Sequence, residues 1–371
     1  MKGVPIRRPA TEPGVTGRDR PVAVAPRAAR RPSRAPEPRG LTVKQWLARR
    51  LADLGGFVTT TVPLRLGYWC ADRAGDLFYR FSPGYRGNVV DNLRHVLYNE
   101  GAAPDLDLLR AKARRTFRYS ARNFYDLMRV RSLSGEAIER SVTIIGSWAP
   151  VDRAAARGKG VIFVTGHFGA FDFAGQMIPL HGYRAVLVTI RTVAEFIHEG
   201  VTYLRGGKGF DLEEATPGGV RRLMRALRDG KTIGLAVDRD FLRNGVPVRF
   251  FGEETTLPIG AVRLALETGA PIVLVICRRH ASRHTFTIEE PFWLTKSGDL
   301  EADLRRGLER LVALFELHIR AAPEQWVMFQ RVWPATPPPP IAVFPVGSPL
   351  EGRVLGGGTS SKAAEPRPPR P

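Results

Sequence analysis

The chain has 371 residues, of which 43% are hydrophobic, so it can bury a large core and is not disordered as a whole. Its formal net charge of +20 predicts an anionic partner, such as phospholipid headgroups, nucleic acid or an acidic carrier. The two cysteines, Cys70 and Cys277, form no disulfide framework or metal motif, and without a long apolar run we expect neither a signal peptide nor a spanning helix.

Two compositionally biased tails flank the part of the chain that is expected to fold. Residues 1–40 contain ten Lys or Arg residues against three acidic ones and no aromatic residue, which predicts a disordered basic tail. Residues 334–371 include four consecutive prolines at 337–340, which predicts a disordered Pro-rich tail. A single folded domain is therefore predicted over residues 41–333.

The first part of this domain is predicted to be helical. In residues 41–57 the large apolar side chains recur close to the 3.6-residue period of a helix, with Lys and Arg on the other face. Such a helix can belong to a core or lie at the headgroup level of a membrane, and Trp46, Phe57, Tyr68 and Trp69 favour the membrane interface. Further helices are predicted over residues 86–98, 105–133 and 135–140.

A different pattern follows Ser141, where short β-branched apolar runs alternate with amphipathic stretches. Such runs suit strands that are buried on both faces. The alternation predicts the α/β class, with a mixed, mainly parallel sheet flanked by helices and a helical N-terminal part. The predicted strands are residues 142–146, 160–166, 183–190, 232–238 and 271–279, with a late antiparallel strand at 286–292. The predicted helices here are residues 171–180, 193–205, 217–229, 258–268 and 300–322.

The segment GHFGAFD carries the clearest chemical signal. It follows a predicted buried strand, and sites in open α/β sheets form outside the carboxyl ends of strands. His167 is therefore placed where a general base is expected, and a loop that enters a helix can bring Asp172 to one imidazole nitrogen. Asp172 would then fix the tautomer of His167, as the acid of a Ser-His-Asp triad does. A structural histidine and a helix N-cap are the alternative interpretations.

The sequence supplies no protein nucleophile to accompany this base. It contains no Gly-x-Ser-x-Gly elbow and no cysteine in a reactive context. The hydroxyl that the base activates is therefore expected to belong to the substrate.

Five segments occur in an order that is typical of one family. They are RGNVVDNLRHVL (86–97), GHFGAFDFAG (166–175), LRGGKGFDL (204–212), AVDRDFLRNGVPVRFFGEETTLPIGAVRLALETGAPIV (236–273) and PEQWVMFQRVW (323–333). Together they resemble the lysophospholipid acyltransferase superfamily, and within it the branch of lipid A lauroyl and mycobacterial phosphatidylinositol mannoside acyltransferases. The resemblance covers roughly residues 45–333. His-x4-Asp alone is a weak signal, but the Asp-Arg-Asp and Phe-Phe-Gly-Glu run makes it specific.

The resemblance implies direct transfer of a fatty acyl group from a thioester to a lipid hydroxyl, without an acyl-enzyme. His167 would be the general base and Asp172 its partner. The implied substrate-binding residues are Arg205, Asp238, Arg239, Asp240 and Arg191. Two departures from the family pattern bear on the identity of the acceptor: Gly169-Ala170-Phe171 replaces Gly-Asn-Trp, and Ile190 replaces the Glu of a Glu-Arg pair.

The same resemblance implies partners and a location. The donor would be acyl-CoA or acyl carrier protein, with no other cofactor and no metal. The acceptor would be a lipid or glycolipid, phosphatidylinositol mannoside-like or lipid A-like. We expect a peripheral protein on an anionic membrane surface, at the cytoplasmic face of the plasma membrane, with no nucleic-acid partner.

Four alternatives stay open at this point. Arg239, between two acidic residues, can form a structural ion pair, and Arg205 can be a solvated surface residue. The positive charge also permits a nucleic-acid-binding protein, although the basic residues do not interleave with aromatic ones in a known pattern. A non-catalytic lipid-binding relative of the same fold is the fourth.

Overall fold

The computed structural model describes residues 41–98, 105–190, 195–206, 209–241, 243 and 245–333. The two predicted tails, residues 1–40 and 334–371, lie outside the described residues, and so does Arg191. From Thr42 onward the described residues belong to one compact unit. Among them, no helix is both long and apolar enough to cross a membrane.

The N-terminal part is helical, as predicted. Its helices are α1 (Val43–Thr61), α2 (Leu64–Phe81), α3 (Pro83–Leu97), α4 (Leu106–Val130) and α5 (Gly135–Ser141). Helix α1 begins with a capping box, in which Thr42 and Gln45 each bond the other's backbone amide. Its small residues Ala48 and Ala52 are buried, whereas its large apolar stripe faces outward, with Val43 81% exposed. The stripe on α1 is therefore not part of the core.

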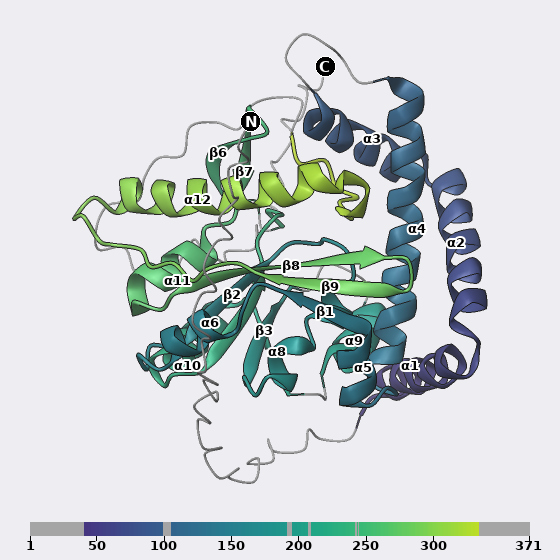
Figure 1. Ribbon diagram of the computed structural model, residues 1–371, viewed down its shortest axis with the longest axis horizontal. Helices are drawn as coiled ribbons and strands as arrows, with labels where there is room; N and C mark the ends of the chain where they lie inside the picture. Colours follow the sequence, from purple (N-terminus) through teal and green to yellow (C-terminus); the bar gives the residue numbers. More distant parts are fainter. Residues whose placement is uncertain are drawn as a thin grey trace, which may run out of the picture. The chain divides into compact units, whose positions relative to one another are not determined.

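Helix α2 was not predicted, and its packing explains why. Its buried stripe consists of Gly67, Tyr68, Ala71 and Gly75 rather than large aliphatic residues. A Cβ on Gly75 would lie 2.7 Å from the Cα of Arg118, so only glycine permits this approach to α4. Figure 1 shows α2 alongside α4 over most of its length. The usual sequence signal for a buried helix face is large apolar residues at helical spacing, and the buried face of α2 lacks it.

The remaining elements alternate between strands and helices. Within the described residues the strands are β1 (Val142–Ile145), β2 (Val161–Thr165), β3 (Ala185–Thr189), β4 (Phe210–Glu214), β5 (Thr232–Ala236), β6 (Val246–Phe250), β7 (Glu253–Leu257), β8 (Ile272–His280) and β9 (Arg283–Ile288). The helices are α6 (Ala149–Ala155), α7 (Phe171–Ala174), α8 (Met177–Leu180), α9 (Glu195–Arg205), α10 (Pro217–Arg228), α11 (Gly260–Thr268), α12 (Leu300–Ala321) and the 3-10 turn η1 (Pro323–Gln325). The prediction of a single helix over residues 171–180 is wrong, because this segment forms two short helices separated by Gly175 and Gln176.

Seven of the described strands form one sheet in the order β1-β9-β8-β2-β5-β3-β4. Strands β8, β2, β5, β3 and β4 are mutually parallel, and β9 returns antiparallel to β8. β1 pairs parallel with β9 and therefore opposes the other five. The predicted α/β fold with a mixed, mainly parallel sheet is confirmed (Figure 1). The late antiparallel strand is present as β9, but at Arg283–Ile288 and not at residues 286–292.

Side chains alternate between two cores, one on each face of the sheet. In β2, Ile162 and Val164 join the core that includes residues of α10, α11 and α12. Val161 and Phe163 join the core on the other face, with residues of α5, α6, α7 and α8. Burial on both faces explains why the central strands are near-continuous apolar runs. The sheet is therefore sandwiched between helices, with its carboxyl edge open for a site.

A fully buried ion pair ties α4 to the sheet. Arg279 at the end of β8 donates to Asp126 of α4 over 2.5 Å, and neither side chain is exposed. Tyr68 of α2 donates to Asp126 over 2.9 Å and accepts from Arg279 over 2.8 Å. Burial raises the pKa of the Tyr68 hydroxyl far above its usual value, so it remains protonated. The imidazole of His284 lies 3.7 Å from Asp126 in the same cluster.

This cluster makes stability depend on pH through His284. Burial, and then the charge of Arg279, lower the pKa of His284 from 6.5 to about 4. Between these values the unfolded chain binds a proton that the native state excludes, so the free energy of unfolding falls as pH decreases, by up to about 3 kcal/mol. We expect His284→Gln to flatten the pH dependence of urea denaturation between pH 7 and 4. The control variant His280→Gln replaces an exposed histidine and should keep the wild-type pH dependence. If His284→Gln also kept the wild-type slope, His284 would not be the source of the pH dependence.

Candidate active site

The register of two neighbouring strands places the candidate base next to a carboxylate. β2 and β5 pair in parallel, with Thr165 opposite Ala236. His167 and Asp238 each lie two residues beyond this pair, so they are side by side at the carboxyl edge of the sheet. The Nδ1 of His167 lies 2.8 Å from one Asp238 oxygen, and the His167 backbone amide donates to the other over 2.7 Å.

Asp238 is a buried acceptor that orients the imidazole. Its side chain has no exposed surface, and the indole Nε1 of Trp326 donates to it over 2.9 Å. Burial would raise the pKa of Asp238, but the charge of His167 and these hydrogen bonds hold it below its usual value. An ionised carboxylate can only accept, so Nδ1 carries a proton toward Asp238 and Nε2 stays available as a base.

Asp172 occupies a different position from the one expected. The guanidinium of Arg205 donates to its two oxygens, over 2.7 and 3.0 Å, and no hydrogen bond joins Asp172 to His167. The expected His167–Asp172 pairing is therefore wrong in this structure. Asp172 lies in α7 and faces Arg205 at the end of α9, whereas the partner of His167 comes from the adjacent strand.

The loop that carries His167 is held by the closing segment of the domain. The amide of Val327 donates to the His167 carbonyl over 2.8 Å, and the Gly169 amide donates to the Gln325 carbonyl over 2.9 Å. Gly169 has a φ of +54°, and a Cβ there would lie 2.0 Å from the carbonyl oxygen of Cys277. Only glycine fits this position, because both the backbone conformation and the close contact exclude a side chain.

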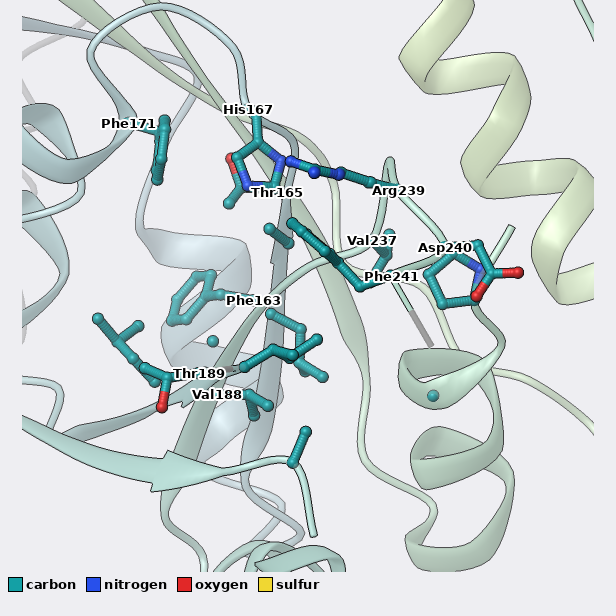
Figure 2. Close-up of a pocket in the computed structure, with 18 of the residues that line it drawn as sticks. Phe163, Thr165, His167, Phe171, Val188, Thr189, Val237, Arg239, Asp240 and Phe241 are labelled. Atoms are coloured by element: carbon teal, nitrogen blue, oxygen red, sulfur yellow. The ribbon is translucent and has the colours of Figure 1, made fainter. Parts of the chain in front are cut away.

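A cavity of about 1440 Å³ opens at His167. This exceeds the roughly 300–1,000 Å³ of pockets for drug-sized ligands. Its lining is mainly apolar, although it also includes charged residues of α11 and α12. Figure 2 draws His167, Phe171 and Arg239 at one end of the view and Phe163, Val188 and Thr189 at the other. The volume and lining suit a long aliphatic chain.

The predicted substrate-binding residues fall into two groups. Arg205, Arg239 and Asp240 line the cavity with His167 and Asp172. Asp238 does not, because it lies beneath the imidazole. This differs from its expected place in a substrate pocket.

The two arginines are both held in place. Arg205 is paired with Asp172 and is not a solvated surface residue. Arg239 stacks on Phe241, 3.6 Å from its ring centre, and its Nε donates to Gln330. Burial lowers the pKa of Arg239 to about 10, so it is still cationic at neutral pH.

Asp240 has a different environment. It accepts from the amide of Gly245 over 2.9 Å and from the hydroxyl of Thr256 over 3.1 Å. Asp240 thereby connects the end of β5 to the β6–β7 hairpin at the cavity wall.

The described residues near His167 include no activated protein nucleophile. Cys277 lines the cavity, but burial raises the pKa of its thiol far above the usual value and keeps it protonated. No group of three or more His, Cys, Asp or Glu in the described part of the chain could hold a metal ion. The chemistry that this site can perform is general-base activation of a hydroxyl brought by a substrate.

The residues that support the His167 loop and Asp238 carry little local signal in the sequence. Trp326 and Gln325 lie in the closing segment PEQWVMFQRVW, whose family resemblance was the available signal. Asn123, which donates to the Gly169 carbonyl over 2.5 Å, lies in the middle of α4 and carries no motif.

Comparison with known proteins identifies the family of the chain. The bacterial lipid A biosynthesis acyltransferase family matches residues 38–334, and the chain belongs to this family. It is therefore an acyltransferase, as predicted.

Two curated relatives show which members of this family the chain resembles. Residues of this chain are 31% identical over 248 positions to a phosphatidylinositol mannoside acyltransferase of Mycobacterium tuberculosis, covering 65% of this chain and 75% of the relative. The phosphatidylinositol mannoside acyltransferase of Mycolicibacterium smegmatis is 30% identical over 246 positions, covering 65% and 77%. The predicted membership of the lipid A and phosphatidylinositol mannoside acyltransferase branch is confirmed.

The close contact at Gly169 generates a stability prediction. We expect Gly169→Ala to lower the free energy of unfolding by at least about 2 kcal/mol, because the new methyl group must displace the Cys277 carbonyl in addition to adopting a strained φ. Gly158→Ala is the matched control, since its φ is +74° and nothing lies within 4 Å of the added Cβ. Urea denaturation measures both, and equal losses would refute the steric argument.

Proposed function

We propose that this acyltransferase moves a fatty acyl group from acyl-CoA or acyl carrier protein to a hydroxyl of a membrane glycolipid, with His167 as the general base. The observation that carries the proposal is the His167–Asp238 hydrogen bond at the mouth of a large, mainly apolar cavity. The curated relatives named as phosphatidylinositol mannoside acyltransferases make a lipid of that type the first candidate acceptor, ahead of a lipid A precursor.

The proposed reaction is one displacement at the thioester carbonyl. Nε2 of His167 takes the proton of the acceptor hydroxyl as its oxygen forms a bond to the carbonyl carbon. The C–S bond then breaks, and the leaving thiolate takes the proton back from the imidazolium. Asp238 holds the ring and stabilises its charge between the two proton transfers.

The carbonyl oxygen gains negative charge during this step and needs a nearby donor. Arg239 is the candidate, because it lines the cavity, stays cationic and is fixed by Phe241 and Gln330. The paired Arg205 and Asp172 are proposed to shape the acceptor side of the same cavity. A substrate-binding role for Arg191 remains a prediction from the sequence.

The acyl chain is proposed to occupy the apolar interior of the cavity. Phe163, Leu187, Val188, Leu223 and Met224 line it from both faces of the sheet. Each methylene group moved from water into such a lining gains about 0.8 kcal/mol, so a long chain can bind without polar contacts.

A membrane partner is supported by the outward face of α1 and α2. Trp46, Phe57, Trp69 and Phe81 are all at least half exposed on these helices. Arginines accompany them, with Arg50 stacked near Trp46 and Arg73 near Trp69, both pairs typical of an interface with headgroups.

The acidic residues of α2 face the other way. Asp72 pairs with Arg122 of α4, and Asp76 pairs with Arg118 of α4. The outer face therefore combines apolar and basic groups, which suits an anionic bilayer. We propose a peripheral position on the cytoplasmic face of the plasma membrane, which the family resemblance implies.

The assignment of the base and its partner generates a prediction for activity. With palmitoyl-CoA and phosphatidylinositol mannoside, His167→Ala should abolish measurable transfer, and Asp238→Asn should lower kcat by about 10³–10⁴-fold, because the tautomer is no longer fixed. Asp172→Asn should lower kcat less, since the His167–Asp238 bond remains. Circular dichroism checks that each variant folds.

The three variants separate the competing interpretations. Wild-type transfer by His167→Ala would refute general-base catalysis by this residue. A large loss in Asp172→Asn with a normal rate in Asp238→Asn would return the partner role to Asp172.

The membrane surface generates a second prediction. The double variant Trp46→Ala and Trp69→Ala should bind vesicles of phosphatidylglycerol and phosphatidylcholine at least about tenfold more weakly, as expected from the apolar area removed. Trp293→Ala removes a tryptophan that is 39% exposed elsewhere on the chain and should bind like wild type. Vesicle co-sedimentation at two salt concentrations measures both, and equal binding by all three proteins contradicts the docking face.

A further inference from the structure

The loop that carries His167 is anchored by two buried side chains of its own, Phe168 and Ala170, but its backbone needs further partners. Between the end of β2 and the start of α7 it has two glycines, Gly166 and Gly169, and its only strand-like pairing within the described residues is an isolated bridge between Phe168 and Trp326. His167 can act only while its ring stays against Asp238, so the loop must be fixed by groups outside it. The closing segment and Asp238 bond His167 and the Gly169 amide, which leaves the Gly169 carbonyl to another partner.

Asn123 of α4 is that partner. Its side-chain Nδ2 donates to the Gly169 carbonyl over 2.5 Å. This bond spans 46 residues of sequence and joins the N-terminal helices directly to the loop. Because Asn123 also lines the cavity, the contact lies beside the space assigned to substrate.

The orientation of the Asn123 amide is set by a buried charge. Its Oδ1 accepts from the guanidinium of Arg279 over 2.9 Å. Arg279 has no acceptor of its own on the side chain, so this contact obliges the oxygen of Asn123 to face it and the nitrogen to face Gly169. Arg279 is in turn fixed by the 2.5 Å bond to Asp126 and by backbone-to-side-chain bonds with Gln325.

We infer that Asn123 is a positioning residue for acyl transfer: held by the buried Arg279, it clamps the Gly169 carbonyl and so keeps His167 aligned with Asp238. The inference rests on the proposed function of His167. Arg279 thereby connects three segments that meet at the loop, namely α4 through Asn123 and Asp126, α2 through Tyr68, and the closing segment through Gln325.

The substitution Asn123→Asp isolates the clamp. The carboxylate is nearly isosteric and still accepts from Arg279, but it cannot donate to the Gly169 carbonyl and repels it. Arg129 lies 3.6 Å from Asp126, so two arginines and two carboxylates would share this cluster, and the new charge is balanced. Asn123→Ala, which removes both bonds without adding charge, is the second variant should the first not fold.

Asn88→Asp provides the matched control. Asn88 of α3 donates from its own Nδ2 to the Phe329 carbonyl over 3.0 Å. The same exchange therefore removes the same kind of bond, but at Phe329 of the closing segment and not at the His167 loop itself.

Two measurements on the full chain test the inference. With palmitoyl-CoA and phosphatidylinositol mannoside, Asn123→Asp and Asn123→Ala should lower kcat about ten- to hundredfold with KM changed less than about twofold, because a small misplacement of the base slows chemistry more than binding. Hydrogen exchange should rise in the peptide containing residues 166–170, while the thermal midpoint of Asn123→Asp should fall no further than that of Asn88→Asp, which loses a bond of the same kind. Asn88→Asp should resemble wild type in both kcat and exchange.

Three outcomes would overturn the inference. Normal kcat and normal exchange in the Asn123 variants, with His167→Ala inactive, would remove the clamp and leave the proposed function intact. Parallel losses of activity and thermal midpoint in the variants of both Asn123 and Asn88 would assign Asn123 to stability alone. Full activity of His167→Ala would remove the proposed function, and the inference with it.

Discussion

The bond between His167 and Asp238 is the interaction on which the rest of the site depends. A carboxylate without any exposed surface is tolerable only when donors surround it. Those donors are the His167 amide, the His167 ring and the Trp326 indole, which come from the β2 edge and the closing segment. The parallel register of β2 with β5 is equally necessary, because a shift of one residue would turn Asp238 to the other face. The site is therefore assembled by the fold itself.

The sequence sufficed to place His167 at the end of a buried strand, but not to identify the carboxylate that it contacts. His167 directly follows a buried strand, and strand ends are where sites form in this fold class. The spacing to Asp172 suggested a pair, yet a residue five positions away enters α7 and meets Arg205 instead. Asp238 lies 71 residues from His167, and their contact depends on β5 inserting between β2 and β3. Strand order of this kind is not contained in local patterns.

The same contrast holds for the fold. The central strands were predictable because burial on both faces requires continuous apolar runs, as in residues 161–165. Helix α2 was not predictable in this way, because its buried stripe consists mainly of small residues. Its large apolar residues, such as Trp69, face outward. The apolar stripe of α1 was recognised, but only the structure distinguishes a core helix from one whose stripe is exposed. Hydrophobic periodicity indicates that a helix has an apolar face, but it does not indicate whether that face packs against the core or is exposed.

Helix α4 unites these features because its faces carry three different environments. Arg118 and Arg122, four residues apart, pair with the acidic residues of α2 and leave the outer side of that helix apolar and basic. Asn123 and Leu127, also four apart, line the cavity. Asp126 points into the interior and neutralises Arg279. Because a helix has 3.6 residues per turn, these residues lie on different faces of α4. Helix α4 therefore supports α2, the buried Arg279–Asp126 pair and the loop that carries His167.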